Sequence, residues 1–261
     1  MRRVETPLIV AGGPLRDRGW IAHEWLIGLL QQDYPAAQLK IACLVNDSQD
    51  DTLEICQWFA QQFPQRVFVR EQNFGVELDG NLRAGRSMEH MALLRNTWLE
   101  WVREEWDPAL FWTTDSDVIF AAETLRSLVE ADKDLVAPMI QFWPEWHTNA
   151  LFWRDPQVGL AEGFRWNPET YDRYELFLAD FVCATPLIKR RVFDAGVRWR
   201  GHEQGEDAAL AWDCTQAGFQ MFCEGRLRAD HRLRKYGVDL QQSERATALL
   251  ADYWRWRHGE N

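Results

Sequence analysis

The fold is decided by ten residues near the middle of the chain, Phe111-Trp112-Thr113-Thr114-Asp115-Ser116-Asp117-Val118-Ile119-Phe120. The apolar start of this stretch predicts a buried strand, and two carboxylates, Asp115 and Asp117, follow at its end. An ionised carboxylate beside an apolar strand is costly unless a cation compensates its charge. Because hard divalent cations prefer oxygen ligands, the pair indicates a metal site at a strand end.

Composition limits the classes of protein to consider. The 261 residues suit one large α/β domain, with 46% hydrophobic and 26% charged residues. The net charge of -11 argues against general nucleic-acid binding, which needs a basic surface. The five cysteines form no C-x-x-C pair, and no apolar leader or long apolar run is present. We therefore expect reduced thiols, no signal peptide, no transmembrane segment and a cytoplasmic location.

Apolar runs alternate with amphipathic segments along the first half of the chain. Strands are predicted at residues 8–11, 39–45, 66–70, 109–114 and 134–140, and helices at 20–31, 50–62, 87–106 and 122–131. This alternation predicts an α/β fold with a Rossmann-like, mostly parallel central sheet flanked by helices. Ligands of such sheets bind beyond the carboxyl ends of the strands, so Asp47 and Asp115 should face one crevice.

The pattern changes after residue 140. Short strands are predicted at residues 150–153 and 163–166, and regular structure at 180–186, 189–195, 206–217, 219–223 and 241–258. We expect a single domain with a nucleotide-binding half (1–140), an acceptor-binding half (141–240) and a C-terminal helix (241–261).

Tryptophan is unusually common, with fifteen residues in the chain. Several lie outside the predicted core strands: Trp143, Trp146, Trp153, Trp166 and Trp199. Their rings either line a pocket for sugars or bases or fill gaps in a loop-rich region.

The Asp-x-Asp at a strand end resembles the metal and nucleotide-sugar motif of glycosyltransferases with the GT-A fold. Two further segments are similar to GT-A motifs, an Arg-Asn pair at 95–96 and an acidic pair at 206–207. The segment Asp47-Ser48-Gln49-Asp50-Asp51-Thr52 resembles one found in family 2 glycosyltransferases. Residues 135–140, which follow Asp132-Lys133-Asp134, together with residues 149–153 resemble the corresponding region of the collagen galactosyltransferases and the Anp1 type mannosyltransferases. The resemblance covers about residues 5–235, although the glycine-rich acceptor turn of family 2 is not evident at 179–181.

On the donor side, the resemblance implies that the nucleotide lies against Asp47 and Arg95, with Ala11 of the first strand and Asp115 as further contacts. A strand-end carboxylate accepts hydrogen bonds from ribose hydroxyls or a base N–H. The planar guanidinium of an arginine binds base carbonyls or phosphate oxygens. The alternative is structural for both residues, with Asp47 in a helix-capping turn and Arg95 on a solvated helix face.

The resemblance also implies a divalent metal that bridges the donor diphosphate, held by Asp117 with Asp115 and His231 assisting. The alternative for His231 is a surface position in a polar loop. An imidazole ligand favours Mn²⁺ over Mg²⁺. The metal would neutralise the charge that develops on the leaving group. Three basic residues follow that would meet the diphosphate, unless they form a solvated face: Arg232, Arg234 and Lys235.

A general base is implied at Gly205-Glu206-Asp207, which precedes an apolar helix. In inverting GT-A enzymes one such carboxylate deprotonates the acceptor hydroxyl. Asp207 is the better candidate and Glu206 the other, while the structural alternative is helix capping by acids. The likeness to the Anp1 type implies retention instead, so the stereochemistry stays open.

The expected function is therefore a metal-dependent glycosyltransferase that moves a sugar from a UDP- or GDP-sugar to the hydroxyl of a carbohydrate or other acceptor. One alternative is a nucleotidyltransferase, because Gly12-Gly13-Pro14-Leu15-Arg16 partly matches a phosphate loop. The other is a non-catalytic protein that binds carbohydrate or a nucleotide sugar.

Overall fold

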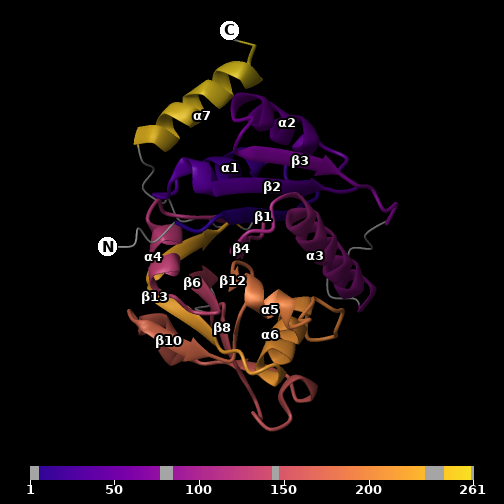
Figure 1. Ribbon diagram of the computed structural model, residues 1–261, viewed down its shortest axis with the longest axis vertical. Coiled ribbons are helices and arrows are strands. Elements are labelled where there is room, and N and C mark those ends of the chain that lie inside the picture. Colours follow the sequence, from indigo (N-terminus) through magenta and orange to yellow (C-terminus); the bar gives the residue numbers. More distant parts are fainter. Residues whose placement is uncertain (1–5, 77–84, 143–146, 233–243, 260–261) are drawn as a thin grey trace.

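The computed structural model describes residues 6–76, 85–142, 147–232 and 244–259 (Figure 1). The main sheet contains β1 (Ile9–Leu15), β2 (Leu39–Val45), β3 (Val67–Glu71), β4 (Leu110–Thr113), β5 (Val118–Ile119), β6 (Leu135–Phe142), β7 (His147–Thr148), β10 (Leu176–Ala179), β12 (Leu187–Lys189) and β13 (Met221–His231). A small second sheet contains β8 (Ala150–Trp153), β9 (Phe164–Trp166) and β11 (Phe181–Val182). The helices are α1 (Ala22–Leu30), α2 (Thr52–Gln62), α3 (Gly85–Glu105), α4 (Thr124–Glu130), α5 (Arg190–Asp194), α6 (Glu206–Gln216) and α7 (Glu244–Arg257), with short 3-10 turns η1 (Ala36–Gln38), η2 (Gly159–Ala161) and η3 (Pro168–Asp172).

The order of strands in the main sheet is β10-β13-β6-β12-β4-β1-β2-β3, with β5 paired to β13 and β7 to β6. Strands β3, β2, β1 and β4 are parallel, and so are β6 and β13. Strand β12 runs antiparallel between β4 and β6. This arrangement confirms the mostly parallel α/β sheet predicted from the sequence.

Alternation along the strands divides the core between the two faces of the sheet. Ile41 and Cys43 of β2 point into the core that α1, α2, α4 and α7 cover, while Ala42 and Leu44 point towards α3. Helices α5 and α6 and the small sheet complete the second core (Figure 1). Strands buried on both faces explain the continuous apolar runs in the sequence.

Strand β1 is longer than predicted, because Gly12-Gly13-Pro14 does not end it. Its pairing with β4 ends at Gly12, so the missing N–H of Pro14 faces a position where no β4 partner is required. A side chain at Gly12 would meet the carbonyl oxygen of Ala42, which lies 2.1 Å from an ideal Cβ position. The glycine therefore permits the close approach of β1 and β2.

Strand β13 also exceeds its prediction, which ended at Cys223. A register shift between Glu224 and Arg228 lets it continue to His231. Glu224 is buried but paired with Arg226, with 2.6 Å between Oε2 and Nη2. The extension brings His231 opposite Val118, beside the Asp-x-Asp segment.

Candidate functional site

The candidate site lies where the carboxyl ends of β1, β2 and β4 meet the end of β13. Asp115 and Asp117 follow β4, and β13 places His231 opposite Val118. The acidic pair Glu206 and Asp207 lies at the start of α6. Both carboxylates approach Arg95 of α3, which connects them to the same site. Parallel strands of this kind form their ligand sites at this edge.

Arg95 of α3 is the centre of the cluster and is only 3% exposed. Its Nη2 lies 2.8 Å from Asp115 Oδ1 and 3.6 Å from Asp207 Oδ2, and its Nε donates to Glu206 Oε1 at 3.0 Å. The guanidinium is thus already engaged by protein carboxylates. Contact between Arg95 and a nucleotide stays a prediction, and the geometry adds a role in holding the acidic residues together.

Negative charge exceeds positive charge around Arg95. Burial, together with the nearby Asp207, raises the pKa of Glu206 to about 7. Burial also raises the pKa of Asp115, against the pull of Arg95, and the charges of Asp207 and Asp117 add to the rise. Carboxylates crowded in this way favour a further cation nearby.

Asp117 lies between the imidazole of His231 and the guanidinium of Arg18. Its Oδ1 is 3.2 Å from His231 Nε2, and its Oδ2 is 3.3 Å from Arg18 Nη2. Burial opposes ionisation, but the hydrogen bond to His231 and the charge of Arg18 hold the pKa of Asp117 below its ordinary value. The lowered pKa keeps the carboxylate of Asp117 ionised at neutral pH, with one oxygen on His231 and the other on Arg18.

The donor set fits a divalent metal only in part. Within the described part of the chain, no group of three or more His, Cys, Asp or Glu side chains is arranged to hold a metal ion. Asp117 and His231, whose Oδ1 and Nε2 contact each other at 3.2 Å, would offer one oxygen and one nitrogen, a combination that Mn²⁺ accepts, while Asp115 is turned to Arg95. Mg²⁺ and similar ions commonly use one or two protein carboxylates and take their other ligands from phosphate and water.

Asp207 is held by two hydrogen bonds besides its approach to Arg95. Its Oδ1 accepts from the indole Nε1 of Trp199 at 3.3 Å, and its Oδ2 accepts from the backbone N–H of Ala184 at 3.1 Å. The carbonyl of Ala184 accepts from the backbone N–H of Asp115 at 2.9 Å. Ala184 was not singled out from the sequence, and Trp199 was considered as a pocket wall or a gap filler but not as a partner of Asp207.

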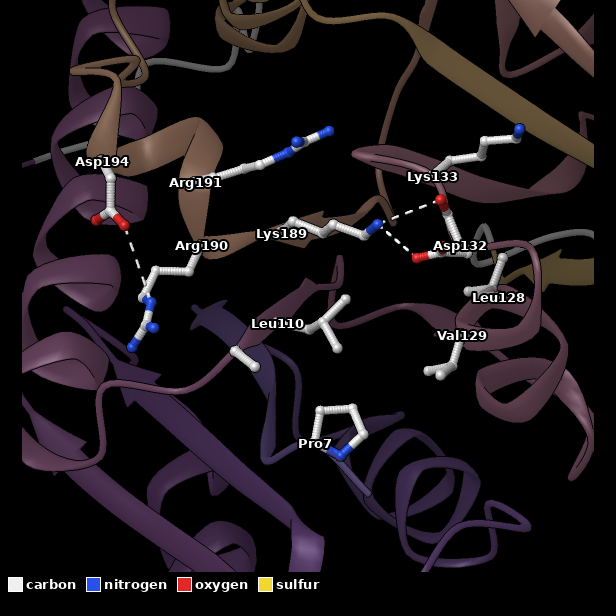
Figure 2. Close-up of a pocket in the computed structure, with 11 residues that line it drawn as sticks. Pro7, Leu110, Leu128, Val129, Asp132, Lys133, Lys189, Arg190, Arg191 and Asp194 are labelled. Carbon is white, nitrogen blue, oxygen red and sulfur yellow. Dashed lines mark hydrogen bonds and ion pairs between the residues drawn. The ribbon is translucent and has the colours of Figure 1, made fainter. Parts of the chain in front are cut away.

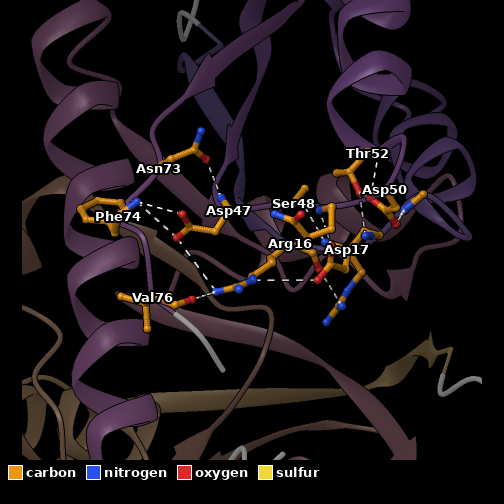
Figure 3. A network of polar contacts seen from close by, with 12 residues as sticks. Arg16, Asp17, Asp47, Ser48, Asp50, Thr52, Asn73, Phe74 and Val76 are labelled. Carbon is orange, nitrogen blue, oxygen red and sulfur yellow. Dashed lines mark hydrogen bonds and ion pairs between the residues drawn. The ribbon is translucent and has the colours of Figure 1, made fainter. Parts of the chain in front are cut away.

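Asp47 lies just after β2, and its carboxylate accepts hydrogen bonds from backbone N–H groups instead of facing solvent (Figure 3). It accepts from the backbone N–H groups of Phe74 and Gly75, at 3.1 and 2.9 Å to Oδ1. Arg16 lies 4.0 Å from its Oδ2 and donates to the carbonyl of Val76 at 2.7 Å. Backbone hydrogen bonds lower the pKa of Asp47 despite burial. Its role towards a nucleotide stays a prediction.

The segment after β1 supplies two arginines that the sequence did not single out as site residues. Arg16 lies beside Asp47, and Arg18 lies beside Asp117. The backbone N–H of Arg18 donates to Thr52 Oγ1 at 2.7 Å, which fixes this segment to the start of α2. By contrast, Ala11 lies in the middle of β1 with its side chain in the core, away from the cluster.

The basic residues predicted to meet the diphosphate are only partly described. Arg232 donates its backbone N–H to the carbonyl of Asp117 at 2.8 Å, and its Nε pairs with Asp230. Arg234 and Lys235 lie outside the described residues.

A cavity of about 420 Å³ lies away from this cluster, at the amino end of β4 (Figure 2). Its walls include Leu110, Leu128 and Val129, and its rim carries Lys189, whose Nζ pairs with Asp132 at 2.6 Å. Because catalytic groups of such sheets gather at the opposite edge, this cavity is not part of the candidate site.

No family model matches the sequence, and no curated protein matches it. Among solved structures, a mannosyltransferase from Pyrobaculum calidifontis in complex with GDP-Man and Mn²⁺ is similar, with a TM-score of 0.56 and 14% identity over 99% of this chain and 66% of the other. The structure of S. aureus TarS 1-349 in complex with UDP-GlcNAc is also similar, with a TM-score of 0.51 and 11% identity over 92% of this chain and 61% of the other.

These likenesses show that the chain has a GT-A type fold, as the sequence predicted. The chain spans less than two thirds of the length of the TarS structure and 66% of the mannosyltransferase. In the part of the chain that the structure describes, no helix is long and apolar enough to cross a membrane.

Proposed function

We propose that this chain is a metal-dependent glycosyltransferase that uses a nucleotide-sugar donor and an acceptor hydroxyl. The observation that carries the proposal is the cluster in which Arg95 joins Asp115, Glu206 and Asp207 at the carboxyl edge of the sheet, beside the pair Asp117 and His231. The similar solved structures bind GDP-Man with Mn²⁺ and UDP-GlcNAc, which supports a UDP- or GDP-sugar as the donor.

Asp117 and His231 would hold the metal, assisted by Asp115 if that carboxylate turns from Arg95. When bound, the metal supplies positive charge to the diphosphate of the donor. Mn²⁺ suits the site better than Mg²⁺ because one of the two protein ligands is an imidazole nitrogen.

Asp207 would act as the general base. One of its oxygens takes the proton of the acceptor hydroxyl while the hydroxyl oxygen bonds to the anomeric carbon and the nucleoside diphosphate leaves. Its side chain is 19% exposed, against 10% for Glu206, so it is the more accessible of the pair. Glu206, bound to Arg95 Nε, would position the guanidinium.

A single displacement of this kind inverts the anomeric configuration, whereas the resemblance to the Anp1 type implies retention. The anomeric proton of the transferred sugar, observed by NMR during the reaction, distinguishes the two outcomes. A cytoplasmic location and a carbohydrate or other hydroxyl acceptor stay predictions of the same proposal.

The structure offers no support for the nucleotidyltransferase alternative. Its partial phosphate loop, residues 12–16, lies mostly within β1, where the backbone pairs with β2 instead of forming an open loop. A phosphate loop needs free backbone N–H groups.

A thermal-shift panel of UDP-, GDP-, CDP- and TDP-sugars, each with and without Mn²⁺, tests the donor and metal together. We expect one base class to stabilise the protein only when Mn²⁺ is present. Asp117→Asn should abolish that stabilisation, while Asp132→Asn, at the distant cavity, should leave it unchanged. If none of the nucleotides stabilises the protein in a metal-dependent way, the proposal fails.

A further inference from the structure

The orientation of the Asp207 carboxylate is fixed from two sides. The indole N–H of Trp199 reaches one oxygen and the backbone N–H of Ala184 reaches the other. An ionised carboxylate offers about four lone-pair sites, so these two hydrogen bonds leave positions free for a proton-donating ligand. Asp207 is thus held in one orientation without being saturated.

Trp199 is itself immobilised. It is 2% exposed, and its ring packs on Phe193 with 5.5 Å between centroids. Asn96 clamps its backbone twice, accepting from the N–H at 3.1 Å and donating to the carbonyl at 2.7 Å. Since Asn96 follows Arg95 on α3, one turn of this helix carries both the charge partner of Asp207 and the side chain that binds the backbone of Trp199.

The backbone of Ala184 links the carboxylate of Asp207 to the backbone of Asp115 by hydrogen bonds. Its φ of 75° lies in the left-handed region, which is strained for a residue with a Cβ. This conformation lets its N–H donate to Asp207 while its carbonyl accepts from the backbone of Asp115. Strain of this kind persists where surrounding structure requires a particular backbone direction.

We propose that Trp199 is a positioning residue that aims the Asp207 carboxylate at the acceptor hydroxyl, with Asn96 fixing Trp199 in place. The proposal rests on the glycosyltransferase function proposed above. A smaller phenyl ring could also pack on Phe193, so apolar packing alone does not account for an indole N–H directed at a carboxylate. A hydrogen bond to a charged group is strong enough to affect the direction of that group.

The decisive variant is Trp199→Phe, which keeps an aromatic ring and removes the N–H. We expect kcat for sugar transfer to fall by about ten- to a hundredfold, the range for losing a hydrogen bond to a charged group. The KM for the donor and the nucleotide-induced thermal shift should stay unchanged, because Asp207 is proposed to act on the acceptor hydroxyl and not to bind the donor.

The matched control is Trp98→Phe. Trp98 is 1% exposed and also donates its indole N–H, but to the backbone carbonyl of Ala42 at 2.9 Å. This substitution should lower stability to a similar extent without a selective fall in kcat. Equal falls in kcat for both variants would overturn the positioning role.

A second measurement is independent of activity. In protein labelled with ¹⁵N-tryptophan, the indole signal of Trp199, identified by its loss in Trp199→Phe, should shift in Asp207→Asn and stay in place in Asp132→Asn. An indole signal insensitive to Asp207→Asn overturns the proposal directly. If the indole signal shifts in Asp207→Asn but no pair of donor and acceptor gives sugar transfer, the proposed function fails. If the signal shifts and Trp199→Phe has a normal kcat, only the positioning role is overturned.

Discussion

Arg95 shows how one side chain can organise a site. Its guanidinium contacts three carboxylates from two segments far apart in the sequence. Because Arg95 is buried, water could not solvate these carboxylates in its place. We expect Arg95→Met to lower the free energy of unfolding at pH 7.5 by about 3–5 kcal/mol, the usual effect of leaving buried charge unpaired.

Urea unfolding with and without a second substitution tests this reason. Adding Glu206→Gln removes one of the unpaired carboxylates, so the double variant should be more stable than Arg95→Met alone. Strictly additive losses would show that Arg95 acts through packing and not through charge.

Arg18 would compete with a bound metal ion for the carboxylate of Asp117. Its Nη2 lies 3.3 Å from Asp117 Oδ2, and its side chain is 34% exposed, so it can move into solvent. We expect Arg18→Gln to tighten Mn²⁺ binding several-fold, because no positive charge then competes for Asp117. Calorimetric titration with MnCl₂ measures the change.

Arg16→Gln is the matched control for Arg18, since Arg16 lies beside Asp47 instead of Asp117. It should leave Mn²⁺ affinity within about twofold of the unaltered protein, because screening weakens the effect of a more distant charge. Weaker Mn²⁺ binding by Arg18→Gln would mean that Arg18 helps to build the metal site.

At the scale of elements, helix α7 is attached to α1 and α2 by aromatic contacts. The ring of His23 on α1 stacks on Tyr253 of α7 at 4.5 Å, and Arg257 pairs with Asp51. Burial, opposed by Asp51 and assisted by Arg257, lowers the pKa of His23 to about 4. His23 is therefore neutral in the folded protein at pH 7.

The sign of the pH dependence follows from that shift. The unfolded chain takes up a proton on His23 near pH 6.5, whereas the folded protein takes it up only near pH 4. Stability from this residue is thus present above pH 6.5 and is lost as the pH falls towards 4, by on the order of 3 kcal/mol at most. We expect His23→Phe to reduce this slope in chemical unfolding, and His258→Gln, at an exposed position on the same surface, to keep it.

The elements that the sequence predicted well are those with long apolar runs. Strand β2 matches its predicted bounds, and α1, α2, α3 and α4 lie within two residues or so of theirs. Strands β10 and β12 were missed, although β8 and β9 are equally short and were predicted, so short strands are recognised from sequence only in some cases. The end of β13 was missed because Glu224, Arg226 and Arg228 look like a polar loop until their partners across the sheet are known.

The same limit applies to the site. The structure brings Arg95, Asp115, Asp117, Glu206, Asp207 and His231 into one cluster, and all six lie in recognisable motifs or beside charged neighbours. Trp199 was weighed as a pocket wall or gap filler, yet it is buried and directed at Asp207. Such a role depends on tertiary contacts with α3 and leaves no local signal in the sequence.

At the scale of the whole molecule, the two predicted halves are interleaved. Strand β12, from the second half, lies between β4 and β6 of the first, and β13 pairs directly with β6. The site likewise takes Asp117 from one half and His231 from the other. The two halves are therefore expected to fold as one cooperative unit.

Hydrogen exchange of the full chain tests this cooperativity. A ligand that binds only the folded state stabilises it by about 2.7 kcal/mol at a hundred times its dissociation constant. We expect the stabilising nucleotide with Mn²⁺ to slow exchange by the same factor in the core amides of β2 and β13, because both exchange through global unfolding. Protection confined to residues before 140 would mean that the first half unfolds separately, despite the strands that cross between them.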